Sequence, residues 1–218
     1  MPGVIAGVAA GAAGLGLAAG GWMYASLWPT SQTFGRTLIA GDNPRDVALT
    51  FDDGPNDAAT PELLEVLARH GVQATFFAIG NYARQKPELV RQELADCNAV
   101  LEDIAGAAVR FFRPPFGARR PLVLQAAREL GLVPVMWNVT GYDWNPIGMD
   151  GILKNLDAGM TSNRAEMRSS NLLLHDGSHR GMSWERMDTV RAVDRLLTSR
   201  QGTDTRFVTV AAWATAAG

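Results

Sequence analysis

The sequence predicts an α/β fold built on a mainly parallel sheet, arranged either as a barrel or as an open doubly wound sheet. Short apolar runs typical of buried strands alternate with segments of helical periodicity over residues 46–212. Strand–helix alternation of this kind joins successive strands by crossover connections, which place neighbouring strands parallel. The chain has 218 residues, of which 47% are hydrophobic, so it can bury the core that such a fold needs.

The predicted elements follow in order. The first strand covers residues 47–51, and the string Thr60-Pro61-Glu62 then predicts a helix that ends at Gly71, with Thr60 as its N-cap. Apolar content predicts the remaining strands at 74–79, 111–112, 133–139, 172–174 and 207–210. Helical patterns are predicted at 87–105, 121–130 and 184–200.

The N-terminal segment predicts the compartment. Residues 1–35 carry no charged side chain, and residues 4–27 are apolar or small, a length that can span a bilayer as a helix. Trp22, Tyr24 and Trp28 near its end are typical of a membrane interface. We therefore expect a membrane anchor or export signal over residues 1–30 and a location in, or outside, a bacterial-type envelope membrane. A cleaved signal peptide and a flexible Ala/Gly leader stay open, because no Lys or Arg precedes the segment.

The rest of the chain is expected to comprise a linker over residues 31–45 and a catalytic domain over residues 46–212. The net charge of −2 comes without a basic block, so no nucleic-acid partner is expected. Cys97 is the only cysteine, which excludes an intrachain disulfide and a cysteine-based zinc cluster. A serine hydrolase is disfavoured because no Gly-x-Ser-x-Gly string occurs.

Two adjacent carboxylates, Asp52 and Asp53, close the first predicted strand before the turn at Gly54-Pro55. They are delivered to the carboxyl end of a strand, where α/β proteins build their active sites. Because a strand alternates faces, the two side chains should point in different directions, so that one can hold a metal while the other handles a proton. The same string is also ordinary turn chemistry, and this alternative stays open.

Three further groups of polar residues follow predicted strands. Arg113 precedes two prolines that fix the backbone, so its guanidinium could orient a carboxylate and the following N–H groups could stabilise an oxyanion. Asp143 and Trp144 follow the strand at 133–139, and His175 follows three leucines, a place suited to acid–base chemistry. Structural interpretations stay open: a rigid turn with a surface arginine, a solvated acid beside a core tryptophan, and a structural histidine.

Together these groups resemble the polysaccharide deacetylases, the family of chitin, chitooligosaccharide and peptidoglycan N-deacetylases. The strings Thr-Phe-Asp-Asp-Gly-Pro (50–55), Arg-Pro-Pro-Phe-Gly (113–117), Asp-Trp (143–144) and Leu-Leu-His (173–175) occur in the family's order, and residues 74–80 look like its second strand. The resemblance implies a distorted (β/α) barrel and a hydrolase that removes N-acetyl groups from a GlcNAc-containing polysaccharide or oligosaccharide. It also implies an N-acetylated glycan as substrate and a divalent metal, usually zinc, as cofactor.

The resemblance assigns a role to each matching residue. Asp52 would be the general base that activates water, and Asp53 would be a metal ligand. Arg113 would orient Asp52, while Asp143 would tune His175, the general acid that protonates the leaving amine. Such a set suits amide hydrolysis, which needs a base for water and an acid for a poor leaving group. The residues expected to hold the oxyanion and to shape the acetyl pocket are Phe116, through its N–H, and Trp144 and Leu173.

One motif of the family is missing. The family's His-x-x-x-His motif would complete the metal triad, but the chain's three histidines, His70, His175 and His179, form no such pair. Roughly two to three dozen residues, a strand with its loop, are absent near Gln92 and Glu93 relative to the family pattern. We therefore expect the barrel to be incomplete there. His70 is expected to complement a helix dipole, and a lone His179 would not recreate a facing pair.

Three interpretations of the chain stay open. The leading one is a metal-dependent N-acetyl-carbohydrate deacetylase, because the proposed acid, base and orienting residues are all present. The second is a catalytically impaired or inactive relative that binds glycan or cell wall without turnover. The third is a truncated product of an active deacetylase, which the abrupt junction near residues 92–93 favours.

Overall fold

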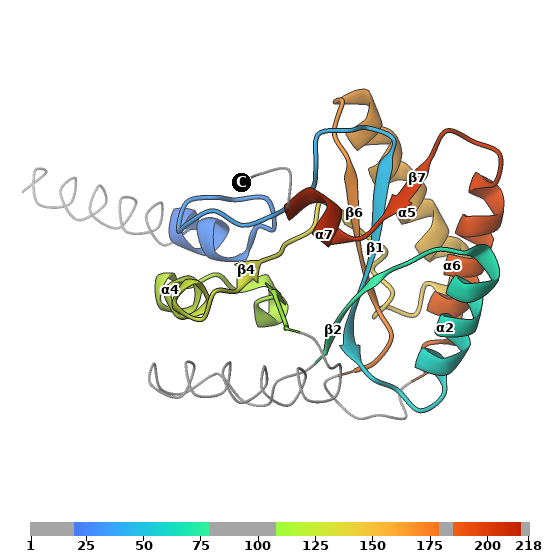
Figure 1. Ribbon diagram of the computed structural model, residues 1–218, viewed down its shortest axis with the longest axis horizontal. Coiled ribbons are helices and arrows are strands. Elements are labelled where there is room, and N and C mark those ends of the chain that lie inside the picture. The colour runs from blue at the N-terminus through green and yellow to red at the C-terminus, as the bar shows by residue number, and fades with distance from the viewer. Residues whose placement is uncertain (1–19, 79–107, 179–184, 215–218) are drawn as a thin grey trace, which may run out of the picture.

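The structure, a computed structural model, describes residues 20–78, 108–178 and 185–214 (Figure 1). Its strands are β1 (Asp46–Gly54), β2 (Thr75–Ala78), β3 (Phe111–Phe112), β4 (Val133–Pro134), β5 (Val139–Thr140), β6 (Ser170–His175) and β7 (Arg206–Val208). Its helices are α2 (Ala59–His70), the 3-10 helix η1 (Pro115–Gly117), α4 (Pro121–Glu129), α5 (Gly148–Ala165), α6 (Met187–Arg200) and α7 (Val210–Ala214).

A parallel sheet forms the centre of the fold. Its order is β2-β1-β6-β5, and β7 pairs with the first residues of β1, while β3 and β4 pair separately. Figure 1 shows α2, α5 and α6 on one side of the sheet and α4, α7 and the N-terminal segment on the other. The predicted α/β fold with a parallel sheet is confirmed. The described strands do not close into a barrel, so closure stays a prediction, and the helix predicted at 87–105 and the junction at residues 92–93 lie outside the described residues.

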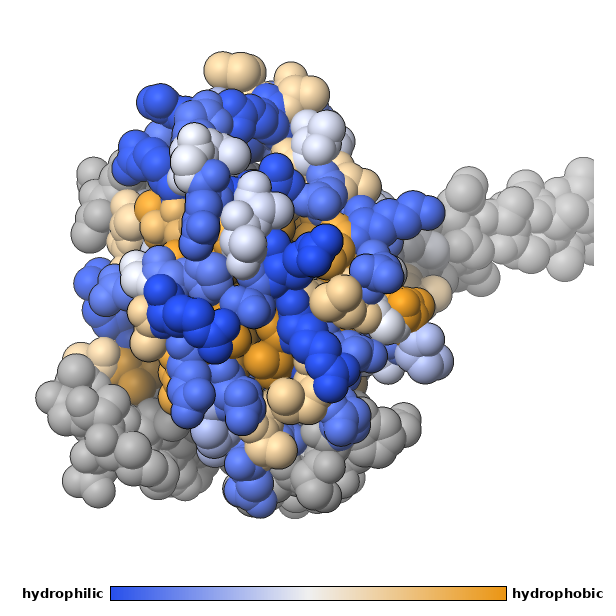
Figure 2. All heavy atoms as spheres, turned by 90° about the vertical axis from the view of Figure 1, so that its right-hand side faces the viewer, coloured by the Kyte–Doolittle hydropathy of each residue, from blue (hydrophilic) through white to orange (hydrophobic). Residues whose placement is uncertain are grey.

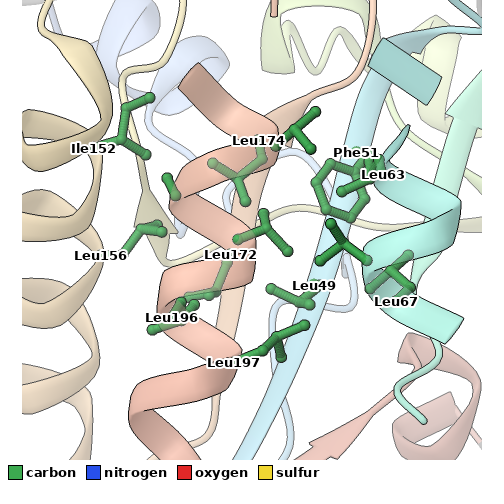
Figure 3. Close-up of a cluster of buried hydrophobic side chains, with 14 of the residues drawn as sticks. Leu49, Phe51, Leu63, Leu67, Ile152, Leu156, Leu172, Leu174, Leu196 and Leu197 are labelled. Atoms are coloured by element: carbon green, nitrogen blue, oxygen red, sulfur yellow. The ribbon is translucent and has the colours of Figure 1, made fainter. Parts of the chain in front are cut away.

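The core explains why the apolar runs form strands. Leu49, Phe51, Leu172 and Leu174 alternate along β1 and β6, and all four are fully buried against α2, α5 and α6 (Figure 3). The helices contribute residues at three- and four-residue spacing, as amphipathic helices do. Alternate strand residues therefore point away from this core, to the face on which Thr50 and Asp52 lie.

Outside this core the helices carry polar residues. Figure 2 looks at the side of the molecule where α2 and α6 lie in Figure 1, and hydrophilic side chains cover most of that face. Several are paired across elements, as Arg200 with Asp157 and Arg164 with Asp204. Exposed pairs of this kind add little stability, so the buried apolar face holds these helices to the sheet.

Some predicted elements are wrong in detail. The single strand predicted at 133–139 is two strands: β4 pairs with β3, and β5 pairs with β6. The chain changes partner between them, where Val135 bridges Leu38 and the Met136 N–H donates to the Leu38 carbonyl. The strand predicted at 207–210 ends at Val208, since Val210 begins α7.

The N-cap predicted for α2 is also wrong. The cap position is Ala58, and the side chain that accepts the first helical N–H groups is Asn56, whose Oδ1 lies 3.0 Å from the Ala58 nitrogen and 2.9 Å from that of Ala59. Thr60 lies inside the helix, and its hydroxyl accepts the Asn56 N–H at 2.8 Å. The predicted end is confirmed, because Gly71 is the C-cap with a left-handed φ of 64°.

Candidate active site

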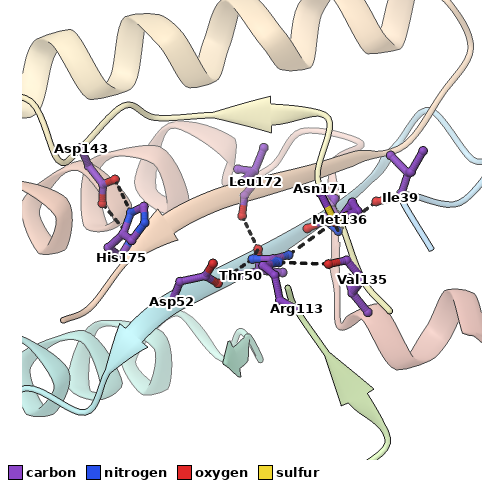
Figure 4. A network of polar contacts seen from close by, with 10 residues as sticks. All are labelled: Ile39, Thr50, Asp52, Arg113, Val135, Met136, Asp143, Asn171, Leu172 and His175. Carbon is purple, nitrogen blue, oxygen red and sulfur yellow. Dashed lines mark hydrogen bonds and ion pairs between the residues drawn. The ribbon is translucent and has the colours of Figure 1, made fainter. Parts of the chain in front are cut away.

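The candidate site lies where β1 and β6 end side by side. In their parallel register Asp52 is the partner of His175, and Phe51 is the partner of Leu174. Paired residues of parallel strands share a face, and successive residues alternate. Phe51 and Leu174 face the helices, so Asp52 and His175 project from the opposite face (Figure 4). The structure therefore brings these two predicted site residues together.

A buried arginine holds Asp52. Arg113 is 7% exposed, and its Nη1 donates to Asp52 Oδ1 at 2.7 Å and to the Thr50 hydroxyl oxygen at 2.9 Å. Its other nitrogens donate to the carbonyls of Val135 at 3.3 Å and Met136 at 3.4 Å, as Figure 4 shows. Asp52 thus receives one hydrogen bond from the Arg113 guanidinium, rather than the two of a bidentate pair. The remaining donors fasten the arginine to the backbone just before β5.

The surroundings of this pair change its proton affinity. Burial raises the pKa of the Asp52 carboxyl above its ordinary value, although the charges of Arg113 and His175 oppose the rise. Burial likewise lowers the pKa of Arg113, and Asp52 opposes that shift. The guanidinium carbon lies 4.2 Å from the ring centre of Phe77, which stabilises the cation. A partly desolvated carboxylate beside a fixed cation is a competent proton acceptor.

The second pair joins Asp143 to His175. The ring nitrogen Nδ1 of His175 donates to Asp143 Oδ1 at 2.8 Å, and the His175 backbone N–H donates to Oδ2 at 2.8 Å. The Asp143 side chain is fully buried. Burial alone would lower the pKa of His175, but the hydrogen bond and charge of Asp143 outweigh it and hold that pKa above its ordinary value. The other ring nitrogen, Nε2, is thereby left to carry a transferable proton.

Two residues of α6 and the turn before it, which the sequence analysis missed, support this pair. The Thr189 hydroxyl donates to Asp143 Oδ2 at 2.9 Å. Arg186 is buried and donates to the carbonyls of Asp143 at 2.9 Å and Gly177 at 2.8 Å. The bonds of Thr189 and Arg186 to Asp143 span 46 and 43 residues of sequence, and the other Arg186 bond reaches a backbone carbonyl. No local sequence pattern therefore predicts them. They fix the Asp-Trp and His-Asp-Gly segments relative to each other.

The predicted acetyl-pocket residues differ in exposure. Trp144 is 46% exposed and meets the His175 ring edge-on, with ring centres 5.3 Å apart. Tyr142, also exposed, packs on Trp144 in the same edge-on way at 5.4 Å. Leu173 is 3% exposed, so it can floor the site but presents little open surface. Phe116 is exposed, with a left-handed φ of 55°, in the turn that follows Arg113.

Asp53 lies on a bulge. The register of β1 against β2 shifts between Asp52 and Gly54, and Asp53 has a φ of 67°. This breaks the strand alternation and separates its direction from that of Asp52. Gly54 is required here, since a Cβ on it would lie 2.1 Å from the carboxylate of Asp176.

Asp176 is a further carboxylate beside these residues, and it was not predicted from the sequence. It is buried, and its Oδ2 accepts the Thr60 hydroxyl at 2.6 Å. Burial raises the pKa of Asp176, while the Thr60 hydrogen bond opposes the rise. The adjacent Gly177 allows close passage of the chain, because a Cβ there would meet the Asp53 carbonyl at 1.8 Å. The Asp-Gly after His175 was the available signal.

The described residues do not fit a three-ligand metal site. No group of three or more His, Cys, Asp or Glu side chains that could hold a metal occurs in the parts of the chain that the structure describes. His70 lies at the far end of α2, where its Nε2 meets Asp194 Oδ1 at 2.7 Å. His179 lies outside the described residues. The role of Asp53 as a metal ligand therefore stays a prediction.

Comparison with protein families finds one described as polysaccharide deacetylase, whose model matches residues 40–96 and 85–135. The two matched segments overlap around residues 92–93, where family residues are expected to be absent. The chain is 36% identical over 167 residues to a chitooligosaccharide deacetylase of Sinorhizobium fredii, covering 63% of this chain and 75% of the relative. It is 29% identical over 198 residues to a peptidoglycan-N-acetylglucosamine deacetylase of Bacillus cereus, covering 77% and 68% respectively.

Solved structures share the fold. A peptidoglycan N-acetylglucosamine deacetylase in complex with 4-naphthalen-1-yl-N-oxidanyl-benzamide has a TM-score of 0.70 and 27% identity, covering 81% of this chain and 91% of that one. A CE4 family pseudoenzyme from Bacillus anthracis has a TM-score of 0.68 and 22% identity, covering 82% of this chain and 68% of that one. The second likeness concerns the fold alone.

Proposed function

The chain belongs to the polysaccharide deacetylase family, and on that premise we propose that it is a hydrolase that removes N-acetyl groups from a GlcNAc-containing glycan. We propose further that its metal binding is impaired, because the described residues supply no three-ligand site. The observation that carries the proposal is the juxtaposition of Asp52 and His175 on β1 and β6, each with its own buried partner. A carboxylate and an imidazole so placed can take a proton from water and give one to a leaving amine.

Each residue contributes a separate step. Asp52, held by Arg113, accepts the proton of the attacking water. His175, whose raised pKa keeps it protonated to higher pH, donates from Nε2 to the amine. The Phe116 N–H stabilises the oxyanion, and Trp144 with Leu173 shapes the acetyl pocket.

We expect this chain to bind its metal more weakly than a family member that has the His-x-x-x-His motif. Zinc is the cofactor that the family resemblance implies, with Asp53 as a ligand, but a catalytic zinc site has three protein ligands. The described residues supply no such set. This observation also favours the alternative function, a glycan-binding relative without turnover.

Acetate release and glycan binding test the proposal together. We expect the purified chain to bind zinc weakly, to bind chitooligosaccharides, and to release acetate from them slowly, with zinc added or withheld. Glycan binding without any acetate release would instead support the glycan-binding alternative. Asp52→Asn should remove any residual release. Trp144→Ala should weaken glycan binding, measured by calorimetry, while Leu64→Ala, at an exposed residue of α2, serves as the control. Tight, stoichiometric zinc binding together with rapid acetate release would contradict the proposed impairment of metal binding. Absence of glycan binding would contradict the whole proposal.

Membrane attachment or export is a further part of the proposal. Among the described residues no helix is long and apolar enough to cross a bilayer. Most of the predicted segment, residues 1–19, lies outside them. The exposure of Trp22, Tyr24 and Trp28 supports a role at a membrane interface.

Fractionation of a bacterium that expresses the full chain tests this attachment. We expect the protein to remain with membranes after carbonate extraction and to be released by detergent, because an apolar segment of this length partitions into the bilayer. A shortened protein outside the membrane would instead indicate a cleaved signal. Full-length protein in the cytosolic fraction would contradict both outcomes.

A further inference from the structure

Arg119 is a buried arginine at the end of the active-site loop. It is 1% exposed and has the largest fully buried side chain among the described residues. Among the described residues its guanidinium bonds backbone carbonyls and no carboxylate: Nε donates to Gly117 at 3.3 Å, Nη1 to Pro29 at 3.2 Å, and Nη2 to Ala25 at 3.4 Å. Further bonds reach the carbonyls of Ser31 and Trp28. A buried charge is tolerated only when its hydrogen-bonding groups are satisfied, and these carbonyls satisfy this one.

Apart from Gly117, every acceptor lies in residues 25–31. This segment contains the end of the N-terminal helix, where backbone carbonyls lack helical partners and carry partial negative charge. The Arg119 backbone N–H also donates to the Ser26 carbonyl at 3.0 Å. A single residue thus joins the N-terminal segment to the loop that carries Arg113 and Phe116. Figure 1 shows that segment, in blue, beside α4.

The loop between the two arginines is conformationally demanding. Phe116 and Gly117 have φ values of 55° and 65°, a left-handed pair that disfavours a residue with a side chain at the first position. Arg113 fixes one end of this loop to β1, and Arg119 fixes the other to residues 25–31. The side chain of Trp137 packs against Gly117, where a Cβ would lie 2.8 Å from it. An end left free would let the Phe116 N–H turn out of position.

We propose that Arg119 is a positioning residue that fastens the active-site loop 113–118 to residues 25–31. The N-terminal segment then supports the active site, in addition to its proposed role in membrane attachment or export. The consequence for catalysis rests on the proposed function, because it assumes that the Phe116 N–H holds the oxyanion. The mechanical link itself does not depend on any activity.

Hydrogen exchange on the full chain tests the link. In Arg119→Lys the cation remains, but an ammonium cannot serve carbonyls in the planar array that the guanidinium reaches. We expect the amides of Gly117 and Ala118, which donate at 2.9 and 3.0 Å within the loop, to exchange at least about tenfold faster, the factor that losing a hydrogen bond to a charged group implies. The segment 25–31 should loosen with them, and the amides of β6 should not change.

The adjacent Arg120, which is exposed, supplies the matched control. Arg120→Lys should exchange as the unaltered chain does. If Arg119→Lys fails to fold, Arg119→Gln is the second variant: its uncharged amide has only two N–H donors for the carbonyls that Arg119 bonds. Faster exchange in both the segment and the loop supports the link. Loosening of residues 25–31 alone, in whichever variant folds, overturns it.

Acetate titration separates this inference from the proposed function. We expect acetate, the released product, to shift the Phe116 amide resonance saturably, and Arg119→Lys to weaken that binding severalfold while Arg120→Lys does not. If the unaltered chain shows no acetate shift at Phe116, the proposed oxyanion role is contradicted, and the exchange result alone decides the link.

Discussion

Arg113→Met is expected to lower the free energy of unfolding by about 3–5 kcal/mol at neutral pH, the cost of breaking a buried ion pair by removing one partner. Arg113 is buried, and its bonds to Asp52 and Thr50 would be lost together with those to the carbonyls of Val135 and Met136. Methionine fills a similar volume, so the loss comes from uncompensated polar groups rather than from a cavity.

The loss should depend on pH in a defined direction. Burial already raises the pKa of Asp52 in the folded protein, and removing Arg113 removes the largest interaction that opposes the rise. A carboxyl whose folded pKa exceeds its unfolded value binds more protons when folded, so stability falls as pH rises through the interval between the two values. We therefore expect the deficit of Arg113→Met to be smallest in acid, where Asp52 is protonated in both states, and to grow towards neutral pH.

Urea unfolding at several pH values measures both effects. Arg120→Met is the control, because Arg120 is exposed and its loss should change stability by less than about 0.5 kcal/mol. Arg113→Lys should fall between the variant and the unaltered chain, since a lysine keeps the charge without the planar fork. A deficit of equal size at acid and neutral pH would show that the buried charge of Asp52 is not its source.

How far the sequence predicts this site follows from the range of each interaction. Asp52 and His175 could be predicted to converge, because each ends an apolar run and parallel strands end at one edge of a sheet. Thr189 and Arg186 could not, because they reach Asp143 across 46 and 43 residues of sequence. Thr60 shows the opposite error: a local capping pattern fits it, but the structure uses its hydroxyl to bind Asp176.

The fold shows the same division. The buried strands β1 and β6 were predicted because each contains an apolar run, at 47–51 and 172–174, as a strand covered on both faces does. The helix α5 was missed although its buried Ile152, Leu156 and Met160 recur every four residues, because the intervening Gly and Asn residues weaken the helical pattern. The strand predicted at 133–139 failed for a different reason: a change of pairing partner leaves no mark on an apolar run.

The missing histidines lead to the second large effect. Inserting into this chain, between Gln92 and Glu93, the segment that carries the His-x-x-x-His motif of a family member should restore tight zinc binding. The insertion point lies outside the described residues, but Asp53, the predicted partner ligand, is described and lies on the bulge at the end of β1. Two added imidazoles would complete the three protein ligands of a catalytic zinc site. Zinc affinity should rise by more than about 100-fold, because loss of a residue that only supports a metal ligand already costs about 10- to 100-fold.

Competition with a chromophoric chelator measures the gain, and paired variants assign it. The same insertion with both histidines replaced by alanine is the control for added length, and should bind zinc as weakly as the original chain. Asp53→Ala in the restored chain should remove most of the gain, because the site returns to two protein ligands, whereas Asp57→Ala, an exposed aspartate four residues away, should not. Acetate release from chitooligosaccharides should follow zinc affinity across the set. Zinc binding that rises equally with and without Asp53 would remove this aspartate from the metal site and with it the predicted division of labour between the two adjacent carboxylates.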